Sequence, residues 1–195
     1  MGRVVVSEFV SLDGVMEAPG PSHDYAHAGW TLKFQDPAGM QYKLQETLDH
    51  DALLLGRVTY EGFAAAWPAA KDDVGFADKM NAMPKHVVSS TLTDPAWNNT
   101  SVISGDVAAA VTGLKESSEG DILVAGSATL VRHLLAHGLI DELRLMVFPI
   151  VLGSGLRLFA ETGQPAVLRL SGSRALDSGS VILTYTAPAA DAGLG

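Results

Sequence analysis

Residues 121–129 constrain the fold more than any other stretch of the chain. They read Asp-Ile-Leu-Val-Ala-Gly-Ser-Ala-Thr, so a short apolar run leads directly into a turn of small residues. Such a run is typical of a strand buried on both faces of a parallel sheet. The turn leaves the backbone accessible, so a phosphate could reach the free N–H groups of a following helix. Alternatively, the glycine only lets the helix pack on the sheet.

A helix is predicted immediately after this turn. Its apolar stripe consists of Leu130, Leu134 and Leu135. Gly138 stands where a left-handed C-cap would end the helix. The pattern therefore predicts a strand, a tight turn and a helix in direct succession.

Two histidine pairs have the four-residue spacing that places both rings on one helix face. They are His23 with His27 and His133 with His137. Neither pair carries the glutamate of a His-Glu-x-x-His zinc site. The second pair lies off the leucine stripe, so we expect it on the solvated surface and expect no metal site.

The bulk composition indicates one globular domain. With 195 residues, 47% of them hydrophobic, the chain can bury one substantial core, and we expect a single domain over residues 1–187 with a flexible tail at 188–195. The net charge of −9 argues against a nucleic-acid partner. Zero cysteines exclude disulfides and thiolate chemistry. No apolar run or signal-peptide pattern stands out, so we expect a cytoplasmic protein that does not bind membranes.

Strands and helices are predicted to alternate up to Gly138. Strands are expected at residues 3–9, 52–55, 85–91, 101–104, 122–124, 141–151, 167–170 and 181–185. Asp36 should cap a helix through residue 50 with Met40, Leu44 and Leu48 on its apolar face. The alternation predicts a mostly parallel α/β sheet, followed by antiparallel C-terminal strands.

A second strand-to-helix junction carries anion-binding groups. Arg57 and Thr59 follow Gly56, so a guanidinium and a hydroxyl lie at the start of a helix. The alternative is an ordinary threonine cap beside a surface arginine. Ser89 and Ser90 place further small donors at the end of the next strand.

The loop after the first strand carries two carboxylates, Asp13 and Glu17. Open α/β sheets bind their ligands beyond the carboxyl ends of the strands. Asp13-Gly14 can also be read as a simple turn. The aromatic segment that follows, which includes Trp30, is interpreted as a lid or binding wall, or else as packing over the edge of the core.

Taken in order, these stretches resemble the dihydrofolate reductase-like superfamily, and specifically the C-terminal reductase domain of the bifunctional riboflavin-biosynthesis deaminase-reductase. The resemblance covers nearly the whole chain. The stretches that carry it are residues 11–14 (Ser-Leu-Asp-Gly), 55–61, 88–90, 125–128 and 149–155.

The resemblance implies a three-layer dihydrofolate reductase-like fold and an NADPH-dependent reductase, commonly a homodimer. The residues that match Arg57, Thr59 and Ser89 hold the adenosine phosphates in such proteins, and those that match 126–128 take the pyrophosphate and nicotinamide side. The loop that matches Asp13-Gly14 closes over the nicotinamide and the substrate. The full set of expected cofactor-binding residues is Gly14, Gly56, Arg57, Thr59, Ser89, Ser90, Gly126, Ser127, Ala128 and Thr129.

The substrate expectation departs from dihydrofolate. Classical dihydrofolate reductases carry an acid on the first long helix, and Met40 stands at the matching position. A ribosyl-pyrimidinone or another small heterocycle is therefore preferred, with a dihydrofolate or pteridine reductase as the alternative. Asp13 and Glu17 are the expected catalytic residues. The expected substrate contacts are Trp30, Met40, Leu152 and Gly153.

Two further alternatives concern activity and assembly. A nucleotide-binding module that has lost catalysis would keep the same junctions. The apolar run at residues 143–152 would be an exposed-edge liability unless covered, so we expect a homodimer that pairs through its C-terminal strands.

Overall fold

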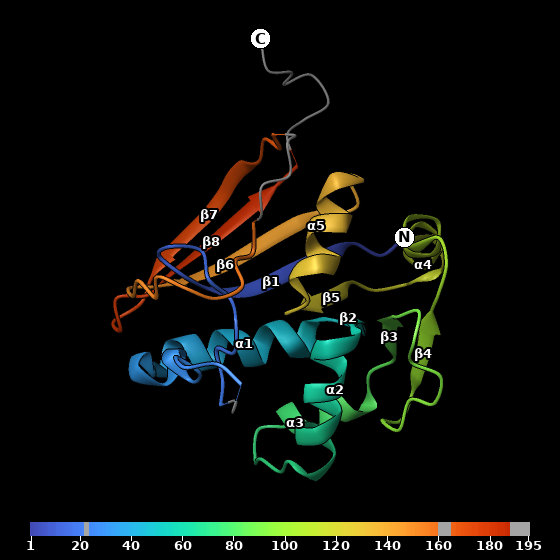
Figure 1. Ribbon diagram of the computed structural model, residues 1–195, viewed down its shortest axis with the longest axis horizontal. Coiled ribbons are helices and arrows are strands. Elements are labelled where there is room, and N and C mark those ends of the chain that lie inside the picture. Colours follow the sequence, from blue (N-terminus) through green and yellow to red (C-terminus); the bar gives the residue numbers. More distant parts are fainter. Residues whose placement is uncertain (22–23, 160–164, 188–195) are drawn as a thin grey trace.

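The computed structural model describes residues 1–21, 24–159 and 165–187. His23 and the predicted tail at 188–195 lie outside these ranges. The described chain builds one eight-stranded sheet in the order β4-β3-β2-β5-β1-β6-β8-β7 (Figure 1). The strands are β1 (Val4–Ser11), β2 (Ala52–Gly56), β3 (Lys85–Val88), β4 (Thr100–Ile103), β5 (Ile122–Ala125), β6 (Glu142–Phe148), β7 (Arg169–Ala175) and β8 (Val181–Thr186).

The predicted mixed α/β sheet is confirmed. β4, β3, β2, β5, β1 and β6 are mutually parallel, whereas β8 is antiparallel to β6 and β7 is antiparallel to β8. The main differences from prediction lie at strand ends. β3 stops at Val88 before the two serines, and β7 runs on to Ala175.

Helices cover both faces of the sheet and give it three layers (Figure 1). One face carries α1 (Pro37–Asp49), α2 (Arg57–Ala66), α3 (Phe76–Ala82) and the short 3-10 helices Trp30–Phe34 and Trp67–Ala69. The other face carries α4 (Val107–Ser117) and α5 (Ala128–Ala136). Throughout the described ranges, every helix is too short or too polar to cross a lipid bilayer.

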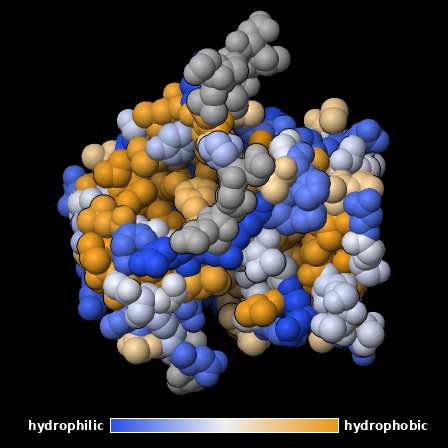
Figure 2. Space-filling model, turned by 45° about the horizontal axis from the view of Figure 1, so that its top comes forward, coloured by the Kyte–Doolittle hydropathy of each residue, from blue (hydrophilic) through white to orange (hydrophobic). Residues whose placement is uncertain are grey.

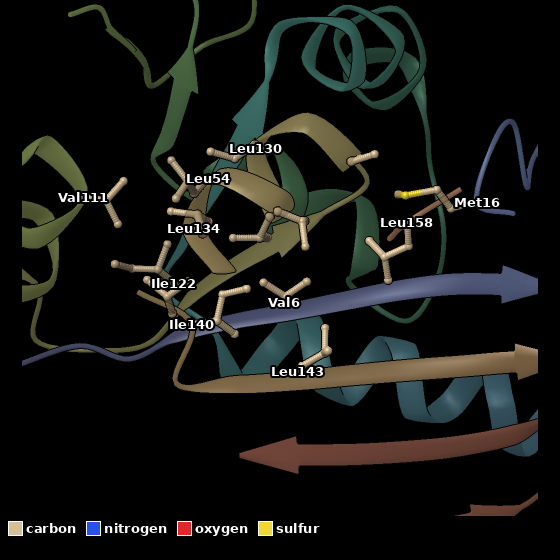
Figure 3. Packing of buried hydrophobic residues seen from close by; sticks show 14 of the residues in the cluster. Val6, Met16, Leu54, Val111, Ile122, Leu130, Leu134, Ile140, Leu143 and Leu158 are labelled. Atoms are coloured by element: carbon tan, nitrogen blue, oxygen red, sulfur yellow. The ribbon is translucent and has the colours of Figure 1, made fainter. Parts of the chain in front are cut away.

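The main core lies between the sheet and helices α4 and α5. Figure 3 shows Leu134 of α5 together with Leu54 of β2 and Ile122 of β5 in this cluster. All three side chains are fully buried. α5 ends as predicted, because Gly138 adopts a φ of 63° and the N–H of Leu139 donates to the carbonyl of Leu134.

Strand lengths differ at the centre of the sheet. β5 stays paired with β1 only as far as Ser7 and Ala125, whereas β1 continues beside β6 until Ser11 lies opposite Phe148. Among the described residues, the edge of β1 that faces β5 therefore has no strand partner from Glu8 onward. This opening lies at the carboxyl ends of the parallel strands, where such sheets bind ligands.

The predicted apolar face of α1 is wrong. Asp36 caps the helix as expected, since its carboxylate accepts from the N–H of Ala38 at 2.8 Å. Met40, however, is 65% exposed, and the buried positions include Glu46 and Thr47. A polar side chain that finds partners inside can take an inward position that hydrophobic periodicity assigns to an apolar one.

The apolar run at residues 143–152, which was expected to need covering, is covered within the chain itself. These residues include most of β6, which lies in the interior of the sheet between β1 and β8. β4 and β7 form the outer edges of the described sheet instead. β7 is largely exposed, and Leu170 on it is 52% accessible to solvent.

Two leucine substitutions test the assigned core. Leu134→Ala should lower the free energy of unfolding by about 2–5 kcal/mol, because it removes a fully buried side chain from packed surroundings. Leu48→Ala on α1 should cost less than about 1 kcal/mol, because Leu48 is 39% exposed. Urea denaturation of both variants measures the difference. If Leu48→Ala lost as much free energy of unfolding as Leu134→Ala, the predicted apolar face of α1 would be supported after all.

Candidate active site

A cavity of about 1000 Å³ lies beyond the carboxyl ends of β1, β2 and β5. Its size is at the upper end of the range for ligand pockets, roughly 300–1,000 Å³. Among the residues predicted for a site, Glu17, Gly56, Arg57, Thr59 and the turn at 126–129 line it. The two strand-to-helix junctions therefore meet in one place.

The turn between β5 and α5 holds two consecutive left-handed residues. Gly126 has a φ of 63° and Ser127 a φ of 68°. A Cβ at Gly126 would come within 2.8 Å of the Thr59 hydroxyl oxygen, so a larger residue would displace the start of α2. The Ser127 hydroxyl accepts from the N–H of Gly56 at 2.8 Å. This hydrogen bond joins the two junctions directly.

Two helix N-termini and one guanidinium face the cavity. α2 begins at Arg57 and α5 at Ala128, and both residues belong to the lining. The first N–H groups of a helix have no partner within the helix and carry a positive partial charge. The guanidinium of Arg57 pairs with Glu61 one turn later at 2.9 Å and remains 44% exposed. These donors suit an anion that lies at the cavity mouth.

Glu8 is a cavity residue that the sequence analysis missed. Glu8 is 3% exposed and belongs to the cavity lining, and one of its carboxyl oxygens accepts a hydrogen bond from the N–H of Gly126 at 3.0 Å. The other oxygen is buried and has no hydrogen-bond partner among the described residues. Burial raises the pKa of Glu8 well above its ordinary value, and the nearby Lys43 ammonium and the Gly126 N–H offset part of that rise.

Lys43, also missed, brings an ammonium from α1 into the same lining. Its Nζ donates to the Ser7 hydroxyl at 2.8 Å and pairs with Glu46, which in turn pairs with Arg144 at 3.2 Å. Burial alone would raise the pKa of Glu46, but Lys43 and Arg144 hold it below its ordinary value. Because these charges are paired with one another, α1 can carry charged side chains on its inward face.

Asp13 does not lie in the cavity lining. Its two oxygens accept from the N–H groups of Leu152 and Gly153 at 3.0 and 2.9 Å, and the Ser11 hydroxyl donates to it as well. The Ser11 hydroxyl and these amides lower the pKa of Asp13. In the described structure Asp13 braces two loops, and its predicted role at the reacting centre stays a prediction.

Glu17 does line the cavity, but one of its oxygens accepts from the N–H of Leu156 at 2.7 Å. Gly14 has a φ of 80° in a tight turn outside the lining, and its N–H donates to the carbonyl of Ser11. The loop therefore reaches the cavity with its second half, from Met16 to Gly20.

Three predicted substrate contacts belong to other parts of the molecule. Trp30 is buried among aromatic rings, and its indole N–H donates to the carbonyl of Glu17. Leu152 and Gly153 hold Asp13 outside the lining. Met40 is exposed on α1, and the α1 residues in the cavity lining are Lys43 and Thr47. The four residues therefore lie outside the cavity lining, and their roles as substrate contacts stay predictions.

The serines after β3 are local turn formers. The Ser89 hydroxyl accepts from the N–H groups of Thr91 and Leu92 at 3.1 and 2.9 Å. Ser90 is exposed. Neither serine belongs to the cavity lining, whereas Val88, the last residue of β3, does. Their assignment as cofactor-binding residues stays a prediction.

The expectation for His133 is wrong. Its ring lines the cavity, with a buried Nε2 that has no partner in the described part of the chain, and it stacks on His137 at 4.2 Å. A leucine stripe identifies the face of α5 toward the sheet, but not the face toward a cavity. Within residues 1–21, 24–159 and 165–187, no group of three His, Asp or Glu side chains is placed to hold a metal ion.

Comparison with known proteins gives consistent matches along the chain. The family model described as RibD C-terminal domain matches residues 3–182. The Bacillus subtilis (strain 168) protein YwjB is 30% identical over 173 residues, which cover 88% of this chain and 91% of that protein.

Solved structures match over the same span. A pyrimidine reductase-like protein from Corynebacterium diphtheriae has a TM-score of 0.64 at 14% identity, and the match covers 96% of this chain and 92% of that one. Dihydrofolate reductase from Enterococcus faecalis, complexed with NADP(H) and RAB-propyl, has a TM-score of 0.62 at 17% identity, and the match covers 95% and 96%. These likenesses confirm the predicted dihydrofolate reductase-like fold.

The brace at Asp13 predicts a pH-dependent stability difference. A carboxyl whose pKa is lowered on folding stabilises the folded protein above its unfolded pKa of about 3.9 and loses this contribution as the pH falls further. Asp13→Asn should therefore lower the urea midpoint at pH 7, and the gap to wild type should shrink toward pH 3.

The control for this test is Asp94→Asn at an exposed loop position. We expect its urea midpoint to follow wild type at both pH values. A gap for Asp13→Asn that stays constant between pH 7 and pH 3 would contradict the charged brace.

Proposed function

The chain belongs to the RibD C-terminal domain family, and from this premise we propose that it is an NADPH-dependent oxidoreductase of a small heterocyclic or ribosyl-pyrimidinone substrate. The observation that carries the proposal is the convergence of two helix N-termini, a guanidinium and a buried acid on one cavity. When bound, the cofactor supplies the hydride, and the protein supplies binding, orientation and a proton path. The cytoplasmic location expected from the sequence is part of the same proposal.

The residues at the junctions fit a dinucleotide. The backbone N–H groups at the starts of α2 and α5 would hold its phosphates, together with the Thr59 hydroxyl and the Arg57 guanidinium. Gly126 allows the phosphate to approach the backbone closely, because no Cβ stands above the turn. A local cluster of donors is enough for one nucleotide, despite the net charge of −9.

The part of the cavity under α1, α2 and α3 fits a flat ring. Phe63, Trp67, Phe76 and Met80 line it with apolar and aromatic surface. Lys43 supplies an ammonium, which donates hydrogen bonds and accepts none. An ammonium suits the carbonyl oxygen of a pyrimidinone, whereas the N–H edge of a diaminopyrimidine would meet a like donor.

Cofactor binding and turnover test the proposal separately. Titration calorimetry should detect NADPH binding. Incubation with NADPH and either an aminopyrimidinone or a dihydropteridine should lower the NADPH absorbance for at least one of the two substrate classes. Binding without turnover on either class would favour a nucleotide-binding module that has lost catalysis. Failure to bind either nicotinamide cofactor at millimolar concentration would contradict both.

Arg57 is proposed to distinguish NADPH from NADH, because the two cofactors differ by one phosphate and a guanidinium grips a phosphate in bidentate fashion. A charge-assisted hydrogen bond is worth roughly 1.5–3 kcal/mol, so Arg57→Ala should weaken NADPH binding by about 10- to 150-fold and leave NADH nearly unchanged. Lys71→Ala, at an exposed position outside the cavity lining, is the control. If Arg57→Ala weakened the binding of NADPH and NADH equally, Arg57 would instead contact a phosphate that the two cofactors share.

A homodimer through the C-terminal strands is part of the proposal. Figure 2 shows a broad hydrophobic area on the left of the molecule, the side where Figure 1 places β7 and β8. β7 is also an outer edge of the sheet, which leaves backbone groups open to pairing. Light scattering should report a dimer at micromolar concentration, and Leu170→Lys should shift it toward monomer. A monomeric wild type would refute this arrangement.

A further inference from the structure

We propose that Glu8 is the acid of the cavity: it holds a proton on its free carboxyl oxygen, binds the acceptor atom of a C=N or C=O group in a flat heterocycle, and delivers that proton during reduction. The proton-delivery step rests on the proposed function. The presence of a neutral acid at this position does not.

The position of Glu8 follows from strand geometry. β5 ends opposite Ser7, so the Glu8 side chain is the first on β1 that stands beyond the end of β5. Oε2 accepts from the N–H of Gly126 at 3.0 Å, which fixes the carboxyl group against the turn. Oε1 is buried, belongs to a residue of the cavity lining, and has no partner among the described residues. One oxygen is thus anchored while the other is left for a ligand.

The surroundings of Glu8 favour its neutral form. Burial is the largest influence on its pKa and raises it well above the ordinary value. The charge of Lys43 lowers this pKa, and the charge of Glu46 raises it. His133 of α5, Arg57 of α2 and Glu17 of the β1 loop line the same cavity. A carboxyl kept neutral in this way can donate a hydrogen bond near neutral pH.

The proposed step balances in atoms and charge. A hydride, which bound NADPH would supply in becoming NADP⁺, adds to the carbon of the C=N or C=O group. The π electrons move to nitrogen or oxygen, and that atom takes the proton from Glu8. Glu8 is left as a carboxylate, which the Lys43 ammonium stabilises until water reprotonates it. The other acid candidates are less suited, because Asp13 lies outside the lining and Glu17 accepts from the Leu156 N–H.

The first experiment is a carbon-13 titration of glutamate carboxyl groups in the full-length protein. Glu8→Gln identifies the Glu8 signal by its loss, and we expect that signal to titrate well above the ordinary glutamate pKa of about 4.3. Lys43→Met should move the midpoint of the same signal to higher pH, because it removes a neighbouring positive charge. Lys43→Met should also move the Glu46 signal, so Glu46→Gln identifies that signal by its loss. The other glutamate signal that Lys43→Met moves belongs to Glu8, even where Glu8→Gln fails to fold. A Glu8 signal that titrates at or below about 4.3 overturns the proposal.

The second experiment compares cofactor affinity and turnover. Glu8→Gln should bind NADPH within about twofold of wild type, while turnover of the aminopyrimidinone or dihydropteridine that wild type reduces falls by about 10²- to 10⁴-fold. In wild type, activity should fall as the pH rises through the raised pKa of Glu8. The residual activity of Glu8→Gln should not show this fall. Glu116→Gln, exposed on α4, is the control.

The two experiments separate the two proposals. Wild-type turnover and pH profile in Glu8→Gln would overturn the role of Glu8 and leave the reductase proposal standing. A wild type that neither binds NADPH nor turns over either substrate class would remove the proposed function, while the carboxyl titration still decides whether Glu8 holds a proton.

Discussion

The cavity depends on a difference in length between two neighbouring strands. β5 leaves the sheet at Ala125, while β1 continues for four more residues beside β6. The chain fills the resulting gap with a left-handed turn, and the N–H of Gly126 in that turn donates to Glu8 of β1. A longer β5 would pair with β1 and bury this edge. The early end of one strand therefore creates the opening, the turn and the position of the acid together.

A cluster of paired charges lies under α1 next to this opening. Lys43, Glu46 and Arg144 form it together with the Ser7 hydroxyl. Breaking one member of a buried pair costs about 3–5 kcal/mol, because the remaining charge loses its partner. The cluster keeps Lys43 close enough to affect the pKa of Glu8 across the sheet.

Local pattern was sufficient for the fold and for the two strand-to-helix junctions that line the cavity. Two stretches could be predicted from neighbouring residues alone: the apolar run before Gly126 and the Gly56-Arg57 junction. In each of them strand, turn and helix follow one another within about ten residues. The brace at Asp13 could not be predicted, because its partners, Leu152 and Gly153, lie about 140 residues away and no local pattern shows that its oxygens accept hydrogen bonds from them. Met40 was misassigned because periodicity cannot tell which polar residues will find buried partners.

A signal for Glu8 was nevertheless present in the sequence. β1 reads Val-Val-Val-Ser-Glu-Phe-Val-Ser, and a strand buried on both faces should be apolar along its whole length. Ser7 and Glu8 interrupt the run at its centre, where the two side chains point to opposite faces. An ionisable group at such a position costs several kcal/mol unless it is paired or neutral. The structure shows one solution on each face: Ser7 meets the ammonium of Lys43, and Glu8 meets a single N–H and an open cavity.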